Sequence, residues 1–420
     1  MKLKELKVLA LATATSAAAV LSSAANAVEI EYWQYFFDAR VTAMEQLIEN
    51  FEAANPDITV KMTHFPYADY RTKVAAAIPA GEGPDVVQLF YGWLNDYKAA
   101  DLIQPLPSDS FPADAIDEDF FPMVSAMREG DSYWALPTAV RSLALFYNTR
   151  LFEAAGIDGP PETLEEMIEI GKSLTERDGA GNITLAGLTM GMTAQDHHWF
   201  REGLVRQFGG EPYLDDYTVV NYNTDAGREA MEFYVGLGET DGIGAIGFMD
   251  EPQAAFKAGR AGMHIDGSFR IGSLNKTRGL EWAVTELPAT SDGVRSNYSS
   301  YWVNAITTKA EGEKYDASVK FMQYVTSDEA MQIWLDVVGE LPAKPSVGLT
   351  EANANDPTFG PFIRGLEYAN TTKFVNESAQ RQILIDMVER VKLEGVSVAD
   401  SLAEAAEAEQ KLLDEFYATN

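Results

Sequence analysis

The sequence contains no cysteine, only four histidines, and half as many basic as acidic residues. Without cysteine the protein can form no disulfide bond, thiol nucleophile, thiolate metal site or lipid-modified N-terminal cysteine. The formal net charge of −32 argues against nucleic-acid binding, because carboxylates repel phosphate groups. We interpret the acidity as a solvated surface that keeps the protein soluble.

Long apolar stretches are also absent beyond the N-terminal region. Residues 1–27 have the features of a secretory signal peptide: three lysines, the apolar or small run Val8–Leu21, and the cleavage sequence Ala25-Asn26-Ala27. The run is short for a membrane span, although an uncleaved anchor is the alternative. We therefore expect a secreted, periplasmic and soluble mature protein.

Common catalytic motifs are missing. HExxH, GxSxG and the P-loop do not occur. His197 and His198 are adjacent, so their side chains point in different directions and suit a metal poorly. Gly242–Gly247 matches GxGxxG but follows a predicted helix instead of a strand, and we interpret it as a loop. No catalytic residue, metal site or cofactor is predicted, and a secreted glycan hydrolase remains an alternative because 64 acidic residues include carboxylate pairs by chance.

The length of 420 residues and the hydrophobic content of 46% predict two domains or one large one. After the predicted cleavage point the pattern indicates strand, helix, strand, helix, strand. The predicted elements are strand 28–35, a helix beginning at Asp38, strand 58–62, helix 67–78 and strand 86–90. This order predicts parallel strands with right-handed crossovers, and hence a doubly wound α/β sheet.

The later part of the chain continues with both kinds of element and no flexible linker. Residues 133–147 are predicted to form two short strands that meet at Pro137. The further predicted elements are helices 163–175, 200–208, 224–237, 251–258 and 315–325, strands 262–265, 282–286 and 302–307, and a helical tract within 378–417. Because no linker separates them, two lobes would be joined by several short crossings.

Aromatic residues gather beside turns and small polar residues. The clusters are residues 33–37, 65–67, 90–93, 197–199 and 298–302. Several come where a predicted strand ends, and ligands of open α/β sheets bind beyond the carboxyl ends of the strands. Aromatic rings suit the apolar faces of sugars, whereas an aromatic residue inside a strand is better explained as core.

Four stretches of the sequence resemble the extracellular solute-binding proteins of ABC importers, in particular the sugar-binding group that includes maltose-binding protein. They occur in the family's order and span nearly the whole mature chain. The stretches are NFEAANPDITV (50–60), AAAIPAGEGPDVV (75–87), ALPTAVRSLALFYNTRLFEAAGI (135–157) and AFKAGRAGMHIDGSF (255–269).

The resemblance implies two α/β lobes around a ligand cleft, of the periplasmic binding protein type II kind. One lobe would comprise residues 28–138 and 303–347, and the other residues 139–302 and 348–420. Closure about the hinge would trap a carbohydrate and present it to a membrane permease. The resemblance also implies a monomer and no enzymatic activity.

The resemblance gives the aromatic clusters their expected roles. Trp33 and Tyr35, two apart on one strand, are expected to form a stacking platform. The other aromatic or histidine candidates are Tyr91, Trp93, His198, Trp199, Phe269, Tyr301 and Trp302. Phe269 stands where relatives usually have tryptophan, and Tyr301 and Trp302 stand where relatives often have glycines, which narrows the cleft.

Five polar residues complete the expected ligand contacts: Asp38, His64, Arg141, Asp266 and Glu367. An interlobe ion pair is the alternative role for Arg141, turn capping for Asp266 and a solvated helix face for Glu367. Two other functions remain open. The ligand could be a glycerol phosphate or another anionic solute, which needs a basic pocket, or the closed form could serve a membrane sensor.

Overall fold

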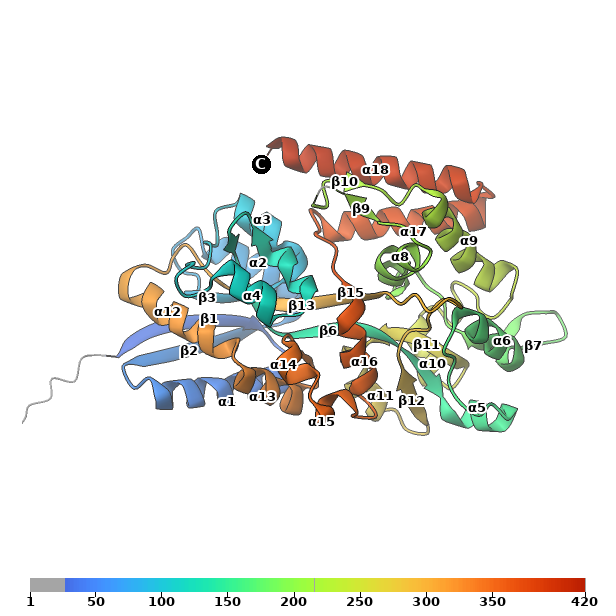
Figure 1. The fold of residues 1–420 in the computed structure, drawn as a ribbon, viewed down its shortest axis with the longest axis horizontal. Coiled ribbons are helices and arrows are strands. Elements are labelled where there is room, and N and C mark those ends of the chain that lie inside the picture. The colour runs from blue at the N-terminus through green and yellow to red at the C-terminus, as the bar shows by residue number, and fades with distance from the viewer. Residues whose placement is uncertain (1–26, 215, 420) are drawn as a thin grey trace, which may run out of the picture.

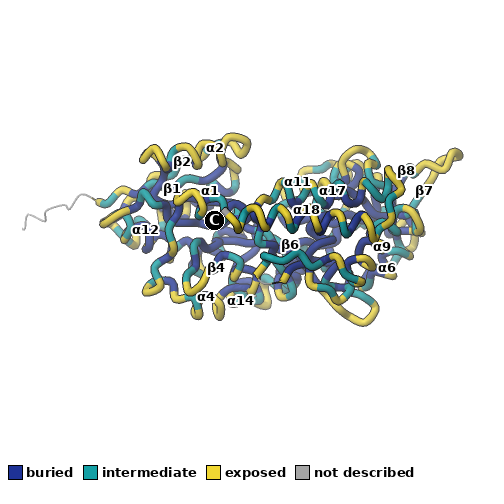
Figure 2. Tube along the Cα trace, turned by 90° about the horizontal axis from the view of Figure 1, so that it is seen from above, coloured by how far each residue is buried: buried dark blue, intermediate teal, exposed yellow. Residues whose placement is uncertain are grey.

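The computed structural model describes residues 27–214 and 216–419. The predicted signal peptide therefore falls almost wholly outside the described residues. Within them, no helix combines the length and apolarity needed to span a bilayer. Strands and helices form two lobes at opposite ends of an elongated molecule (Figure 1), and buried chain segments run through both (Figure 2). This arrangement confirms the predicted two-lobed α/β fold.

The first lobe begins with parallel strands, as predicted. Strand β1 pairs in parallel with both β2 and β3. Val41, Met44, Leu47, Ile48 and Phe51 recur at helical spacing and form an apolar stripe along α1. The helix buries all of them except the half-buried Val41, so the stripe faces the core. The early elements are β1 (Val28–Tyr35), α1 (Asp38–Ala54), β2 (Ile58–Phe65), α2 (Tyr67–Ala77), β3 (Val86–Phe90), η1 (Tyr91–Trp93), α3 (Leu94–Ala99), α4 (Ala113–Asp119), η2 (Pro122–Met127), β4 (Arg128–Glu129) and β5 (Ser132–Tyr133).

Two long strands carry the sheet from one lobe to the other. Strand β13 (Asn297–Ile306) pairs antiparallel with β3 and with β6 (Leu136–Asn148), and β6 continues onto β11 (Ala261–Gly267). The resulting sheet has the order β2-β1-β3-β13-β6-β11-β8-β7, with β12 and β14 on β6 and β15 on β13. Figure 1 shows β6 and β13 running side by side through the middle.

The prediction of two strands meeting at Pro137 was wrong. Pro137 is the second residue of the continuous strand β6. It pairs with Val303, where the register between β6 and β13 shifts. Such an irregularity and a position near the strand start both tolerate a proline, which lacks the N–H group that a ladder needs.

The second lobe packs helices closely on β8 (Ile183–Leu188). A Cβ atom at Gly187 would lie 2.1 Å from the carbonyl oxygen of Gly171, so glycine permits α6 (Leu164–Leu174) to approach the strand. The GxGxxG stretch lies between α9 (Asp225–Glu239) and α10 (Pro252–Lys257) and is a loop, as predicted.

The other elements of the chain are short, apart from α12 and α13 of the first lobe. They are α5 (Thr149–Ala155), β7 (Glu176–Arg177), α7 (Asp196–His198), η3 (Trp199–Leu204), α8 (Val205–Gln207), β9 (Tyr213–Leu214), β10 (Val219–Val220), η4 (Ser268–Arg270), α11 (Ile271–Asn275), β12 (Trp282–Thr285), α12 (Gly312–Val325), α13 (Asp328–Val338), β14 (Leu341–Pro342), α14 (Pro345–Gly348), α15 (Glu351–Ala354), α16 (Gly360–Gly365), η5 (Leu366–Tyr368) and β15 (Ala369–Asn370).

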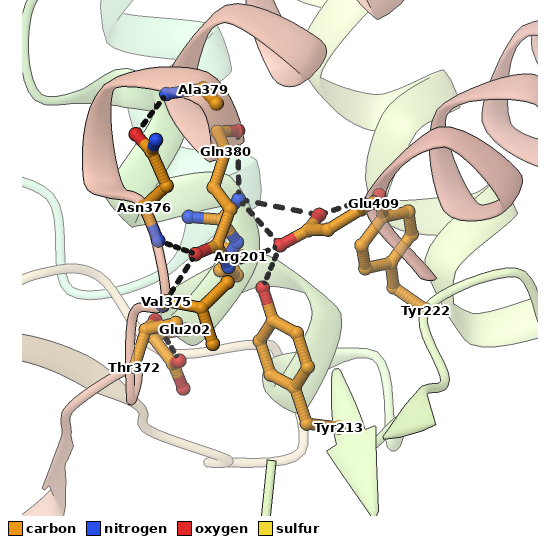
Figure 3. Close-up of polar contacts among 10 residues, drawn as sticks. All are labelled: Arg201, Glu202, Tyr213, Tyr222, Thr372, Val375, Asn376, Ala379, Gln380 and Glu409. Atoms are coloured by element: carbon orange, nitrogen blue, oxygen red, sulfur yellow. Dashed lines mark hydrogen bonds and ion pairs between the residues drawn. The ribbon is translucent and has the colours of Figure 1, made fainter. Parts of the chain in front are cut away.

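The C-terminal helical tract forms two helices, α17 (Glu377–Glu394) and α18 (Val398–Thr419), which cover the second lobe (Figure 1). A cluster of buried polar side chains connects both helices to the π-helix η3 by hydrogen bonds and an ion pair (Figure 3). Arg201 of η3 pairs with Glu409 of α18 at 3.3 Å, and both side chains are fully buried. Glu409 also accepts hydrogen bonds from Tyr213, Tyr222 and Gln380, so its charge is well compensated.

Candidate functional site

Trp302 lies at the centre of an aromatic cluster beside the carboxyl ends of β1 and β3. Its ring centroid is 4.2 Å from that of Tyr35 and 5.4 Å from that of Trp93. Strand β1, η1 and β13 supply these three residues, and each is less than a tenth exposed. Trp33 packs edge-on against Phe65 at 4.9 Å. Four of the predicted aromatic contacts therefore lie at the carboxyl ends of β1 and β3 or beside them.

A second aromatic cluster joins the lobes. The hydroxyl groups of Tyr91 and Tyr298 lie 2.7 Å apart, and His198 stacks on Tyr298 with ring centroids 3.8 Å apart and an interplanar angle of 7°. Tyr301 packs against Tyr91, with ring centroids 4.8 Å apart and the ring planes tilted by 33°. Phe374 lies 5.9 Å from Tyr91. The structure thus brings Tyr91, His198 and Tyr301 together through two residues outside the predicted set.

Sequence reasoning missed Tyr298 and Phe374 for different reasons. Tyr298 belongs to the aromatic run 298–302, which the sequence analysis identified. Residue order alone did not show which aromatic residue of that run contacts His198. Phe374 follows β15 in a segment with no helical or strand periodicity. The backbone of Phe374 also accepts a hydrogen bond from Asn95 of the first lobe at 3.1 Å, so this segment contacts both lobes.

Several buried polar atoms near these clusters have no partner among the described residues. They are Trp33 Nε1, both ring nitrogens of His197, His198 Nδ1, Ser268 Oγ and Ser299 Oγ. Burial, with Arg201 and Arg381 nearby, holds the pKa of both histidines well below its usual value. Neutral imidazoles can donate and accept, and unpaired buried groups of this kind need water or a ligand.

An ionic triad lies where β6 crosses between the lobes. Glu340, which is buried, binds Arg40 and Arg141 and accepts a hydrogen bond from Trp334 Nε1 at 3.0 Å. Burial alone would raise the pKa of Glu340, but Arg141 and Arg40 lower it to about 2. Arg141 also lies over Phe269 of the second lobe, 5.2 Å from the ring centroid. Arg141 therefore makes the ion pair to the first lobe that was the alternative to ligand contact, and it also contacts Phe269.

A cavity of about 730 Å³ opens beside this triad. Helices α1 and α13 form one wall, and η4 and α11 form the other. Its lining includes the predicted residues Tyr35, Arg141 and Phe269, together with Phe37 and Ser268. A volume of this size suits a small-molecule ligand. The cavity is contributed by both lobes and by a crossing strand, and it is the candidate site.

The sequence profile of bacterial extracellular solute-binding proteins matches residues 46–361, about three quarters of the chain. The chain belongs to this family. The maltotriose-binding protein of Pyrococcus abyssi is 26% identical over 351 residues, covering 81% of this chain and 72% of the relative. The sn-glycerol-3-phosphate-binding periplasmic protein UgpB of Escherichia coli O1:K1 is 22% identical, covering 84% and 86%.

Solved structures show the same fold. The cyclic α-maltosyl-1,6-maltose binding protein of Arthrobacter globiformis has a TM-score of 0.81 and 20% identity, covering 93% of this chain and 100% of that one. The fold of this solute-binding protein is therefore the two-lobed one that the resemblance implied.

The remaining predicted residues of the solute-binding protein lie elsewhere. Trp199 is 1% exposed and packs edge-on to Tyr234 in the second lobe at 6.2 Å. Asp38 and His64 are exposed on the first lobe, and Glu367 is exposed on η5. Glu367 lines a different depression from the candidate cavity. The structure does not bring these four residues to the cavity, and among the residues of the two aromatic clusters only Tyr35 lines it.

Asp266 organises the turn before Phe269. Its carboxylate accepts hydrogen bonds from the backbone N–H of Gly267 at 2.7 Å and from Arg270 Nε at 2.5 Å. Burial raises its pKa, but His264 and Arg270 outweigh this and lower it. These contacts correspond to the turn-capping role that was the alternative for Asp266. Asp266 also positions Arg270, which lines the cavity.

A buried carboxyl group with raised pKa occurs outside the cavity. Burial raises the pKa of Asp196 to about 6, and its Oδ2 accepts hydrogen bonds from the Gly191 N–H and the Tyr234 hydroxyl, both at 2.7 Å. Asp196 is 4% exposed and does not line the cavity. The site geometry accordingly supports binding by stacking and hydrogen bonding.

Proposed function

We propose that this protein is a periplasmic solute-binding protein that captures a mono- or oligosaccharide between its lobes and delivers it to the permease of an ABC importer. The observation that carries the proposal is the cavity beside Tyr35 and Phe269, which is built from both lobes and includes the buried, unpaired hydroxyl group of Ser268. Aromatic rings stack on sugar faces while polar groups bind hydroxyls. The similarity to a maltotriose-binding protein supports the same ligand class.

The protein would work by closing its two lobes around the ligand. The lobes are residues 28–138 with 303–347 and residues 139–302 with 348–420, and they would close about β6 and β13. Residues 1–27 would be removed on secretion, and the mature protein would act as a monomer without catalysis. Phe269 and Tyr35 would contact sugar rings, and Arg141 and Ser268 would bind hydroxyls.

A second candidate ligand is a glycerol phosphate or a related anionic solute. Two observations favour it: Arg141 and Arg270 line the cavity, and one relative is an sn-glycerol-3-phosphate-binding protein. The aromatic wall formed by Phe269 fits this ligand less well, because glycerol phosphate has no ring to stack.

Thermal unfolding of residues 28–420 against a ligand panel tests the proposal. The panel holds mono- and oligosaccharides, glycerol 3-phosphate and amino acids. A ligand at 100 times its Kd adds about 2.7 kcal/mol of stability, so a selective shift by a sugar, with the sugar recovered intact, is expected. A shift by glycerol 3-phosphate alone would overturn the ligand class. Conversion of the sugar to product would overturn the binding-protein role.

A further inference from the structure

The charge of the cavity is opposite to that of the protein. Acidic residues outnumber basic ones two to one in the chain, yet basic residues outnumber acidic ones in the cavity lining. The charged lining residues are Arg40, Arg141, Arg270, Lys276, Asp336 and Glu340. A concave, partly desolvated surface with excess positive charge attracts anions.

The buried part of this charge is not neutralised by its own ion pairs. Arg40 and Arg141 share the single carboxylate of Glu340, so the triad carries a net positive charge. Arg141 donates from Nε and Nη2 to Glu340, and its Nη1 has no hydrogen-bond partner among the described residues. An arginine left with free donors beside a cavity suits a planar anion such as a carboxylate.

Two guanidinium groups lie close to the ring of Phe269. The Cζ atom of Arg141 is 5.2 Å from the ring centroid, and that of Arg270 is 5.5 Å from it. Arg270 donates from Nε to Asp266, and its two terminal nitrogens have no acceptor among the described residues. The site therefore offers an aromatic ring with two free cationic donors close to it.

Two uncharged groups add donors to the same cavity. Ser268 Oγ is buried, lines the cavity and has no partner among the described residues. The first turn of α1, at Phe37–Ala39, also lines the wall. No side chain caps this helix, so its first N–H groups add partial positive charge.

We infer that the ligand is an acidic carbohydrate, a sugar that bears a carboxylate or a sulfate group. The sugar ring lies against Phe269, and the acidic group binds the free donors of Arg141 and Arg270, with Ser268 as a further donor. This inference rests on the proposed function and narrows it, because a neutral sugar would leave the cationic donors unpaired.

Calorimetric titration with matched probes tests the charge preference. Trigalacturonic acid is compared with its fully methyl-esterified form, and glucose 6-sulfate with glucose. A charge-assisted hydrogen bond predicts about 10- to 100-fold tighter binding of the acidic member of a pair. Raising the NaCl concentration weakens binding of the acidic member only.

Variants identify the residues. Arg270→Gln, which leaves the triad intact, should reduce the acidic preference about tenfold or more, and Arg141→Gln should do the same. Arg228→Gln is the matched control, because it removes the same charge from the exposed surface of α9, where Arg228 pairs with Asp225. It should leave the preference unchanged.

Three outcomes distinguish the hypotheses. Equal or tighter binding of the neutral member in both pairs would overturn the acidic-carbohydrate inference and leave the proposed function standing. Binding of glycerol 3-phosphate with no sugar bound would overturn both. An acidic preference that Arg270→Gln and Arg228→Gln reduce equally would also overturn the inference, since it would reflect overall charge.

Discussion

The hydroxyl groups of Tyr91 and Tyr298 lie 2.7 Å apart in the buried region between the lobes. Tyr91 directly follows the last parallel strand of the first lobe, and Tyr298 lies on the crossing strand β13. Because His198 of the second lobe stacks on Tyr298, this hydrogen bond connects the aromatic residues of both lobes.

Replacing Tyr298 by phenylalanine should lower the free energy of unfolding by about 1–2 kcal/mol, because the buried hydroxyl of Tyr91 loses its partner. Urea-induced unfolding measures the change. Tyr315→Phe is the control, since Tyr315 is only half-buried, and it should be close to wild type. Equal stability of the Tyr298→Phe variant and the wild type would contradict the importance of this contact.

Gly92 permits the close packing of the aromatic cluster. A Cβ atom there would lie 2.9 Å from Phe90 Cε1 and 3.2 Å from Phe374 Cδ2. Gly92→Ala should therefore destabilise the protein by about 1–3 kcal/mol and weaken ligand binding. Gly236→Ala on helix α9 is the control: nothing lies within 4 Å of its added Cβ, so it should stabilise by up to about 1 kcal/mol. Similar effects of the two variants would refute the packing argument.

Glu340 should make stability depend on acid pH. Its pKa falls from 4.5 to about 2 in the folded protein, because of Arg141 and Arg40. A carboxyl group whose pKa is lowered in the folded state stabilises the fold at pH values above its unfolded-state pKa. This stabilisation is lost as the pH falls through the folded-state pKa. The free energy of unfolding should therefore fall by about 3 kcal/mol between pH 5 and pH 2. Denaturant midpoints across that pH range measure the change.

The variant Glu340→Gln supplies the comparison. It leaves two buried arginines without their carboxylate and should cost about 3–5 kcal/mol at neutral pH. Its stability should then fall less steeply below pH 5 than that of the wild type. Parallel pH profiles for the variant and the wild type would exclude Glu340 as the source of the acid sensitivity.

Glu409→Gln should also destabilise the protein, by about 3–5 kcal/mol, because it leaves Arg201 buried without a counter-charge. Figure 3 shows that Gln380 and the two tyrosines converge on the same carboxylate. Glu407→Gln, on the exposed side of α18, should change stability by less than about 0.5 kcal/mol. A negligible effect of Glu409→Gln in thermal unfolding would show that Arg201 finds other partners.

Local sequence patterns predicted the elements that frame the site. The apolar stripe through Met44, Leu47 and Phe51 predicted where α1 lies in the sequence, because helical periodicity depends only on neighbouring residues. The family's stretches at 75–87 and 135–157 located β3 and the first crossing. Arg141 was predicted on that crossing, with an ion pair as an alternative to ligand contact.

Local sequence patterns could not predict which residues from distant parts of the chain contact one another at the site. Arg40 contacts Glu340 from 300 residues away in the sequence, and neither residue belongs to a motif. Trp199 was expected at the ligand, but it is buried in the second lobe against Tyr234. Phe374 reaches the first lobe from a segment without any periodicity.

The sequence by itself determined the class of protein, the alternation of strands and helices and the abundance of aromatic side chains at strand ends. These properties follow from residue order over short distances. Only the tertiary structure decided which rings stack and which charges share a cavity, because β6 and β13 bring together segments far apart in the chain. The excess of positive charge between Arg141 and Arg270 is therefore invisible in a composition dominated by acidic residues.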